Sequence, residues 1–234
     1  MWTVPSRRSS TDQRQAITAD RIARAALDLV RESGYAAVSM RAVADRLGTG
    51  QASLYAHVRG KADLERLMVE TIAAEIDRPS TGSWRTDLES EAARTQEVYA
   101  RYPGLAVAAF ASLPTDERYA ERLEARLELL QSAGLEPRQA QAADLVVWLL
   151  AIVRAIEDAQ IAARIAESGL TADEWWQHAR EVVTSDPESR PLMAQTGAYL
   201  NPDDRAWMSR ELIELVLDGI QARYGPTRPS GTEG

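Results

Sequence analysis

The residues whose types and spacing are best suited to recognition chemistry lie in the segment RLGTGQASLYAHVRGK, from Arg46 to Lys61. Small or hydrogen-bonding side chains follow its second glycine, with no carboxylate among them: Gln51, Ala52, Ser53, Tyr55, Ala56 and His57. A glutamine amide can pair bidentately with adenine, an alanine methyl can contact thymine, and a serine hydroxyl can contact a base or a phosphate. The segment is therefore suited to contact a DNA duplex.

Two cations extend this set: Arg41, which precedes the segment, and Lys61, which ends it. Arg41 has the reach and the planar fork to bind guanine or a phosphate. Lys61, together with Tyr55 and His57, is placed to hold phosphate groups, aided by the N-terminus of the helix that begins at Lys61. On helical periodicity alone, a structural corner of three helices with no DNA partner is an equal alternative.

Capping residues predict the helices that position these side chains. The expected helices are Ala19–Ser33, with Thr18 as N-cap and Gly34 as C-cap; a short one between the N-cap Ser39 and Gly48; Gln51–His57; and Lys61–Arg78. Two helices joined by a glycine-containing turn, packed under a preceding helix, form a helix-turn-helix. The second helix of that motif enters the major groove of DNA.

The remaining sequence also has helical periodicity and no alternating strand pattern, so we predict an all-α fold. Expected helices cover 85–101, 104–112, 116–132 with Thr115 as N-cap, 138–168, one opened by the capping box Thr171–Glu174, and one from Asn201 and Pro202 to Tyr224. Residues 184–200 are expected to form a loop with one helical turn. The domain boundary is placed at RPSTGSW, which is rich in Pro, Ser and Gly.

These boundaries predict five regions: a flexible N-terminal tail at 1–17, a helix-turn-helix domain at 18–78, a linker at 79–84, a second helical domain at 85–224 and a disordered tail at 225–234. Charge divides in the same place. Residues 1–67 hold 11 Lys and Arg against 7 Asp and Glu, whereas the remainder holds 16 against 28. The basic N-terminal part is therefore the part expected to meet a polyanion, despite a net charge of -8 for the whole chain.

The composition and the missing motifs argue against several other classes of function. The 234 residues include no cysteine, which excludes disulfides and thiol catalysis, and only two histidines, His57 and His178. The Walker, dinucleotide-binding, zinc-protease and serine-hydrolase motifs are all missing, so we expect no enzyme activity, no cofactor and no metal. There is no apolar run near the roughly 20 residues of a membrane span and no secretory signal, so a cytoplasmic protein is expected. A helical enzyme that happens to contain this corner stays as a weaker alternative.

The segment Asp20–Leu64 resembles the DNA-binding domain of the tetracycline-repressor (TetR) family. The resemblance lies in AAL and G of the first helix, in S-M-R-x-V-A-x-x-L-G of the second, and in S-L-Y-x-H-V-x-x-K-x-x-L across the third and fourth. It implies DNA contacts at Arg41, Gln51, Ala52, Ser53, Tyr55, His57 and Lys61. Ala56 departs from the pattern, because the family usually has a larger, often aromatic residue there.

The later segment ARYPGLAVAAFASLP and the run LLQSAGLEPRQAQAADLVVWLLAIVRAIEDAQ look like the effector-binding domain of the tetracycline-repressor branch. That resemblance implies a homodimer that binds a palindromic operator and is released by a small-molecule effector. The long helix near 138–168 and the last helix near 203–223 would form the dimer interface. The last helix is unusually apolar, and its interface candidates are Trp207, Met208, Leu212, Leu215, Val216 and Ile220.

The effector pocket is less well located by the sequence. The candidates are Tyr102, Phe110, Trp148, Arg154, Glu157, Trp175 and His178. Aromatic residues at helical spacing are more often core than pocket, Arg154 and Glu157 can simply pair with each other, and His178 can be an ordinary surface or core residue. A constitutive DNA-binding regulator without effector sensing therefore stays as an alternative to a ligand-responsive repressor.

Overall fold

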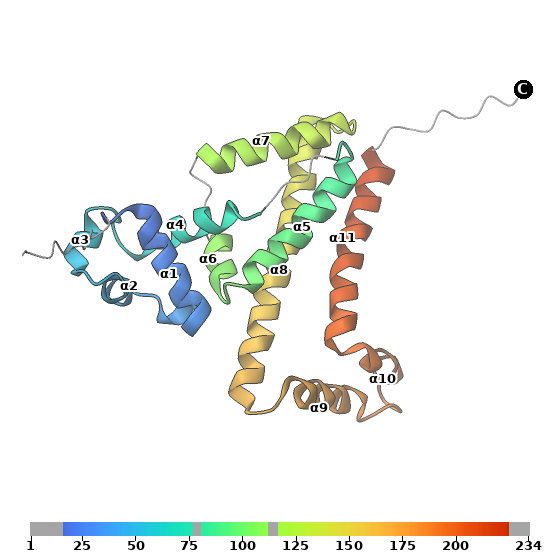
Figure 1. The fold of residues 1–234 in the computed structure, drawn as a ribbon. Helices are drawn as coiled ribbons and strands as arrows, with labels where there is room; N and C mark the ends of the chain where they lie inside the picture. The colour runs from blue at the N-terminus through green and yellow to red at the C-terminus, as the bar shows by residue number, and fades with distance from the viewer. Residues whose placement is uncertain (1–15, 77–80, 112–116, 225–234) are drawn as a thin grey trace, which may run out of the picture.

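A computed structural model describes residues 16–76, 81–111 and 117–224, and its described part is all-α with no strand. The N-terminal part, called the head here, contains α1 (Ala19–Ser33), α2 (Met40–Arg46), α3 (Gln51–Tyr55) and α4 (Lys61–Ala73), with a 3₁₀ turn η1 (Tyr35–Ala37) after α1. The rest, called the body, lies beside it (Figure 1). The expected all-α fold with an N-terminal helix-turn-helix is confirmed.

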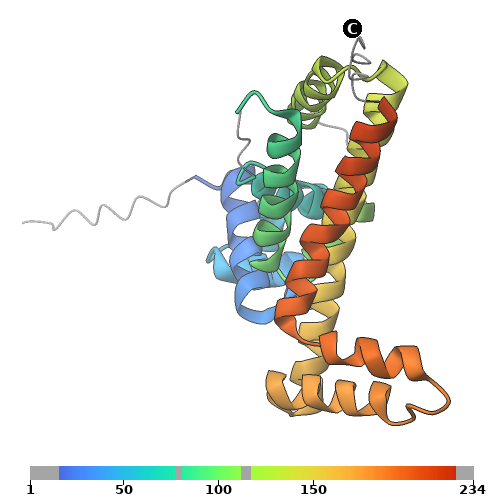
Figure 2. The ribbon, with the colours of Figure 1, turned by 90° about the vertical axis from the view of Figure 1, so that its right-hand side faces the viewer.

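The body is a helical bundle with an extended arm. Its helices are α5 (Trp84–Ala100), α6 (Leu105–Ala111), α7 (Glu117–Ser132), α8 (Pro137–Ser168), α9 (Ala172–Thr184), α10 (Pro191–Thr196) and α11 (Pro202–Tyr224), with a 3₁₀ turn η2 (Gly197–Tyr199) after α10. Helices α8 and α11 run side by side along the bundle, and α9 and α10 form the arm at its lower end (Figure 2). No helix of the described residues is long and apolar enough to cross a membrane.

The caps expected from the sequence form the expected hydrogen bonds. The Thr18 hydroxyl accepts from the Arg21 N–H at 3.2 Å, and the Ser39 hydroxyl accepts from the Ala42 N–H at 3.1 Å. Thr171 and Glu174 form the reciprocal capping box of α9. These bonds satisfy backbone N–H groups that a helix start leaves without partners, and they fix where each helix begins.

Two helix ends and one loop differ from expectation. Helix α3 stops at Tyr55, and Ala56 and His57 form a turn. Helix α4 ends at Ala73, because Glu75 donates to the Ile72 carbonyl in the tighter bonding of a 3₁₀ turn. The expected loop at 184–200 contains both α10 and η2, which is more helix than one turn. The predicted cap Thr115, the residues Asp116, Ser112 and Arg78, and most of the two predicted tails lie outside the described residues.

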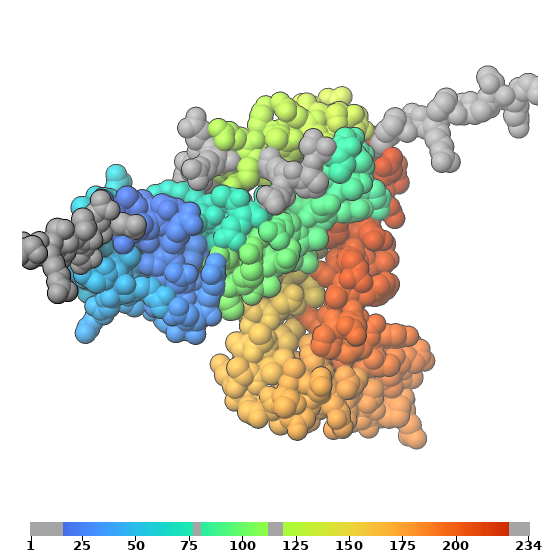
Figure 3. Space-filling view, viewed as in Figure 1, coloured from blue at the N-terminus to red at the C-terminus, as the bar shows by residue number. Residues whose placement is uncertain are grey.

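Two apolar clusters hold the molecule together. One is confined to the body and joins α5, α7, α8 and α11 through residues such as Leu88, Leu130 and Leu217. The other is shared, because buried residues of the head pack with Val98, Tyr102 and Leu105 of the body. The space-filling view accordingly shows the head joined to one side of the body, with the arm apart from it (Figure 3). The shared cluster means that the head and the body are packed against each other as well as linked by the chain.

Candidate DNA-binding surface and ligand cavity

The short helix α3 presents its polar residues to solvent. Gln51, Ala52, Ser53 and Tyr55 are exposed, and so is His57 in the turn that follows. The helix is too short to be stable alone, and it is held by two side chains that point the other way: Leu54 is fully buried and Val58 is 1% exposed. The alternation leaves a row of hydrogen-bonding groups on a rigid support.

Arg41 and Lys61 are also exposed, but they differ in what holds them. The Arg41 side chain is 82% exposed and lies 3.8 Å from the Asp45 carboxylate, so it is free to turn toward another anion. The Lys61 ammonium lies 5.5 Å from the centre of the Tyr35 ring and 3.9 Å from Glu65. The Lys61 side chain is therefore held against the surface of the head by two weak contacts.

The seven predicted DNA contacts belong to α2, to α3 with the turn after it, and to the first residue of α4. Figure 1 places α2 and α3 at the end of the head that is farthest from α11. The expected phosphate site at the start of α4 is shared with an acidic side chain, because Asp63 accepts a hydrogen bond of 3.0 Å from the Arg59 N–H. This bond and the Arg66 guanidinium lower the pKa of Asp63, so the carboxylate stays charged there.

A cavity of about 360 Å³ lies between five helices of the molecule. Its wall is formed by side chains of α4, α5, α6, α7 and α8, with Ile76 just past the end of α4. Of the helices of the head, α4 lines the cavity, through Arg66, Val69, Glu70 and Ala73. The cavity is large enough for a small organic molecule, and such a molecule would touch α4 directly.

Two of the predicted effector residues line this cavity. The rings of Phe110 on α6 and Trp148 on α8 lie parallel, with 6.4 Å between their centres and an angle of 4° between their planes. They offer flat apolar surface at one side of the cavity. Both are predicted from the sequence as candidates because they are large aromatic residues.

Tyr102 does not line the cavity; it lies at the junction of the head and the body. Its side chain is 1% exposed, and its hydroxyl accepts a hydrogen bond of 3.0 Å from Arg31 of α1. The same hydroxyl donates to Glu75 at 2.8 Å, just after α4. Tyr102 therefore bridges two segments of the head from the body, a contact that local sequence periodicity does not reveal.

Arg154 and Glu157 also lie away from the cavity. They pair with each other, as the alternative interpretation held, and Glu157 is also 3.2 Å from Arg205 of α11. Trp175 packs edge-on against Trp176, which is buried, and the Arg205 guanidinium lies 5.7 Å from the Trp176 ring centre. His178 is exposed on α9. The contacts of Glu157 and Trp176 with Arg205 join α8, α9 and α11, and none of these residues lines the cavity.

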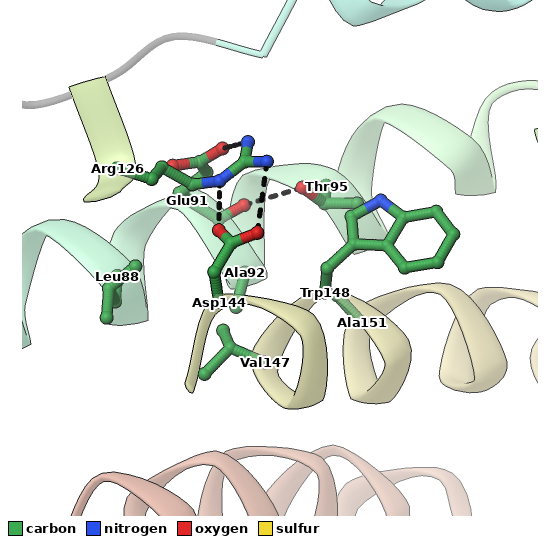
Figure 4. A pocket seen from close by; sticks show the side chains of 9 residues that line it. All are labelled: Leu88, Glu91, Ala92, Thr95, Arg126, Asp144, Val147, Trp148 and Ala151. Carbon is green, nitrogen blue, oxygen red and sulfur yellow. Dashed lines mark hydrogen bonds and ion pairs between the residues drawn. The ribbon is translucent and has the colours of Figure 1, made fainter. Parts of the chain in front are cut away.

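A buried ionic cluster that lines the cavity was not anticipated. Arg126 of α7 forms a two-pronged contact with Asp144 of α8, and it lies 3.0 Å from Glu91 of α5 (Figure 4). Burial disfavours the charge on Arg126, but the two carboxylates more than compensate and raise its pKa. No local sequence signal identifies this cluster, because its three members come from three helices.

The candidate dimer residues on α11 divide into exposed and buried side chains. Trp207, Leu212 and Leu215 are 53%, 39% and 58% exposed, whereas Met208 and Val216 are partly buried. Ile220 is only 7% exposed and packs in the apolar cluster of its own body. Ile220 is therefore used inside the protomer, and the exposed stripe of α11 lies at the other positions.

Comparison with known proteins gives matches over nearly the whole described chain. The pattern of the bacterial regulatory proteins of the tetR family matches residues 22–68, and that of the tetracyclin repressor-like C-terminal domain matches residues 78–224. The HTH-type transcriptional repressor DrrR1 of Streptomyces coeruleorubidus is 31% identical over 182 residues, which are 76% of this chain and 66% of that protein. The Escherichia coli tetracycline repressor protein class D is 27% identical over 203 residues, covering 85% and 87%.

The fold has close counterparts among solved structures. ActR of Streptomyces coelicolor without ligand superposes with a TM-score of 0.77 at 23% identity, covering 89% of this chain and 96% of ActR. The complex of ActR with actinorhodin has a TM-score of 0.78 at 24% identity, covering 91% and 99%. These structures show the shared fold, and the two sequence patterns show the family. The chain therefore belongs to the TetR family, whose members are DNA-binding transcriptional regulators and not enzymes.

Proposed function

We propose that this protein is a ligand-responsive repressor that binds a palindromic operator as a homodimer and is released by a small molecule. The domain at 18–78 would bind DNA, and the domain at 85–224 would bind the effector and the second subunit. One observation carries the proposal: α4 begins at the candidate DNA contact Lys61 and also forms a wall of the 360 Å³ cavity. Occupancy of the cavity and the position of the head are therefore mechanically linked.

The dimer proposal is supported by exposed apolar stripes on α8 and α11. On α8, Val146 and Val153 are exposed and seven residues apart, which places them on one face of the helix. On α11, Leu212 and Leu215 are exposed at helical spacing. Since the two helices run side by side, their stripes from two protomers can form a four-helix interface that buries this surface.

A dimer also explains how a small DNA-binding surface can be specific. In each subunit, Gln51 and Arg41 would contact bases and Ala52 and Ser53 would add shorter contacts. Tyr55, His57 and Lys61 would hold phosphates and fix the register. Two heads spaced about 34 Å apart, one turn of DNA, would bind two half-sites of an inverted repeat.

Release by a ligand requires that the ligand bind better to the dimer that does not fit DNA. A molecule in the cavity would press on Val69 and Ala73 of α4 and displace the start of that helix relative to its partner subunit. The distance between the two heads would change, and both could no longer enter adjacent grooves. The ActR structure with actinorhodin supports this proposal by showing a protein of this fold in complex with a small molecule.

The proposal is tested by selecting bound sequences from a random duplex pool and measuring the stoichiometry of the complex across salt concentrations. The expected result is an inverted repeat with half-sites about one helical turn apart, bound by two chains. Weak, salt-sensitive binding with no enriched sequence would contradict the operator proposal. If an operator is found but no small molecule weakens its binding, the constitutive alternative is correct.

A further inference from the structure

Three arginines line the cavity, and two of them are already neutralised. The Arg66 guanidinium lies 2.7 Å from Asp63 and also contacts Glu70 on the wall, and Arg126 is held by Asp144 and Glu91. Each carboxylate on the wall is therefore ion-paired with Arg66 or Arg126: Glu70, Glu91 and Asp144. The wall has as many carboxylates as arginines, but the pairing leaves one cation over.

That cation is Arg122 of α7. It is half-buried, lines the cavity, and takes part in no hydrogen bond or ion pair with any side chain that the structure describes. A guanidinium has five N–H donors in a planar fork that matches a carboxylate or a related oxyanion. Within a cavity, where water screens charge less than at an open surface, an unpaired cation strongly favours an anionic partner.

A second polar group of the wall lies close to Arg122. Tyr99 of α5 is 6% exposed, lines the same cavity, and its hydroxyl has no hydrogen-bond partner among the described residues. Burial raises the pKa of this hydroxyl, and the charge of Arg122 opposes that rise only in part. Tyr99 therefore remains a protonated phenol that can donate a hydrogen bond into the cavity.

Most of the remaining wall is apolar. It includes Val69, Ile76 and Leu145 in addition to the parallel rings of Phe110 and Trp148. Flat rings favour offset stacking on another planar ring system. The cavity therefore combines an unpaired cation with flat apolar surface.

We propose that the cavity binds an organic anion: its charged group pairs with Arg122 and accepts a hydrogen bond from Tyr99, and its ring-containing apolar body packs against Phe110 and Trp148. The proposal rests on the proposed function in taking this anion to be the effector. An uncharged molecule of the same shape leaves Arg122 and Tyr99 without partners. The site would therefore discriminate against it, because charge-assisted hydrogen bonds are the strong ones in such a cavity.

The test uses two matched fluorescent probes on the full-length protein without DNA. The probe 1-anilinonaphthalene-8-sulfonate is an organic anion, and N-phenyl-1-naphthylamine has the same rings without the sulfonate. Binding is followed by probe fluorescence, with energy transfer from tryptophan compared between the native protein and Trp148→Phe to locate the probe. We expect the sulfonate to bind at least about tenfold more tightly, as one charge-assisted hydrogen bond implies.

Three variants complete the test. Arg122→Gln is expected to weaken binding of the sulfonate about tenfold and to change binding of the uncharged probe by less than about twofold. Arg122→Lys is expected to restore most of the sulfonate affinity. Arg138→Gln, which removes an exposed arginine outside the cavity wall, is the matched control and is expected to change neither probe.

The proposal is overturned if the sulfonate fails to bind, if the two probes bind equally, or if Arg122→Gln weakens both to the same extent. A second measurement, of operator affinity with and without the bound anion, separates this proposal from the proposed function. If the sulfonate binds through Arg122 but no anion that binds there alters operator affinity, the anionic site is supported and release by ligand is contradicted. If an effector releases the operator and binds equally to Arg122→Gln, release is supported and the anionic site is contradicted.

Discussion

The candidate DNA-binding surface and the ligand cavity are built in opposite ways. The surface comes from one short stretch of chain, in which Leu54 and Val58 are buried and the residues between and before them are exposed. The cavity comes from five helices, and the residues that meet there, such as Val69 and Trp148, are far apart in the sequence. Changes to the surface should therefore act locally, whereas changes to the cavity should reach the stability of the whole body.

The two regions also treat charge differently. The Arg41 side chain on the surface is 82% exposed, while the Arg126 side chain in the cavity wall is 10% exposed and paired with two carboxylates. Salt screens exposed charges over about 8–10 Å and affects buried pairs much less. DNA affinity should therefore depend strongly on salt, whereas the contribution of the buried ion pairs to the free energy of unfolding should not. The following predictions test this contrast, beginning with the largest effect.

Replacing Arg126 with methionine should have the largest effect. Asp144 and Glu91 would remain in the interior without their cation, which costs about 3–5 kcal/mol for a buried pair. Urea unfolding of the native protein and Arg126→Met measures the change in the free energy of unfolding. A loss below about 1 kcal/mol would show that the cluster is as well hydrated as a surface ion pair.

Two controls separate the buried charge from the loss of packing. The double variant Arg126→Met with Asp144→Leu should recover part of the stability, because Asp144 would no longer be a buried unpaired charge. Arg138→Met, on the exposed start of α8, should change stability by less than about 0.5 kcal/mol. Equal losses of stability for Arg126→Met and Arg138→Met would contradict the prediction that the buried ion pairs matter more than an exposed charge.

Gln51→Ala and Arg41→Ala should lower operator affinity by about 1–3 kcal/mol per half-site and relax base preference at one position each. Lys61→Ala should weaken binding to all duplexes alike and flatten the dependence on salt. Fluorescence anisotropy with operator and random duplexes distinguishes these outcomes. An equal loss on both duplexes for Gln51→Ala would contradict its role in contacting a base.

Gly104→Ala should disturb the contact between the head and the body. Gly104 has a φ of 87°, and an added Cβ would lie 3.0 Å from Cβ of Tyr35 in the head. Gly169, at the end of α8, has a φ of 71° and open space around it, so Gly169→Ala is the matched control. Both should lose about 1–2 kcal/mol of stability from backbone strain, but only Gly104→Ala should change operator affinity.

Tyr102→Phe should have the smallest effect and the most specific one. It removes the hydroxyl that joins Arg31 and Glu75 without changing the ring. We expect operator affinity to change by about 0.5–2 kcal/mol, although Tyr102 is buried away from the DNA-binding surface. The measurement is operator anisotropy together with urea unfolding. An unchanged operator affinity with lower stability would mean that this bridge only holds the fold.

The sequence indicates which residues of the candidate DNA-binding surface face solvent better than it indicates which residues line the cavity, for a physical reason. Caps such as Thr18 and Ser39 and the spacing of Leu54 and Val58 are local signals, and they fix which side chains face solvent. The cavity depends on which helices meet, and of the predicted effector residues only Phe110 and Trp148 line it.

The predicted polar effector residues Arg154 and Glu157 do not line the cavity. Arg154 and Glu157 have the composition of a ligand site, but their partners are charged residues of α8 and α11. No local sequence pattern marks Arg122. It is a candidate ligand contact because it lines the cavity and has no side-chain partner in the described fold. Unpaired groups of this kind can be found only after all the neighbours are in place.

The most direct test of the central claim compares two substitutions on adjacent residues of one segment. Ala73 lines the cavity and is 8% exposed, whereas its neighbour Ala74 is exposed to solvent. Operator anisotropy is followed while small organic compounds are added to the native protein, to Ala73→Leu and to Ala74→Leu. The account predicts compounds that release the operator from the native protein and from Ala74→Leu, but release it poorly from Ala73→Leu. Equal release from all three proteins, or no release by any compound, would contradict the claim that occupancy of this cavity controls DNA binding.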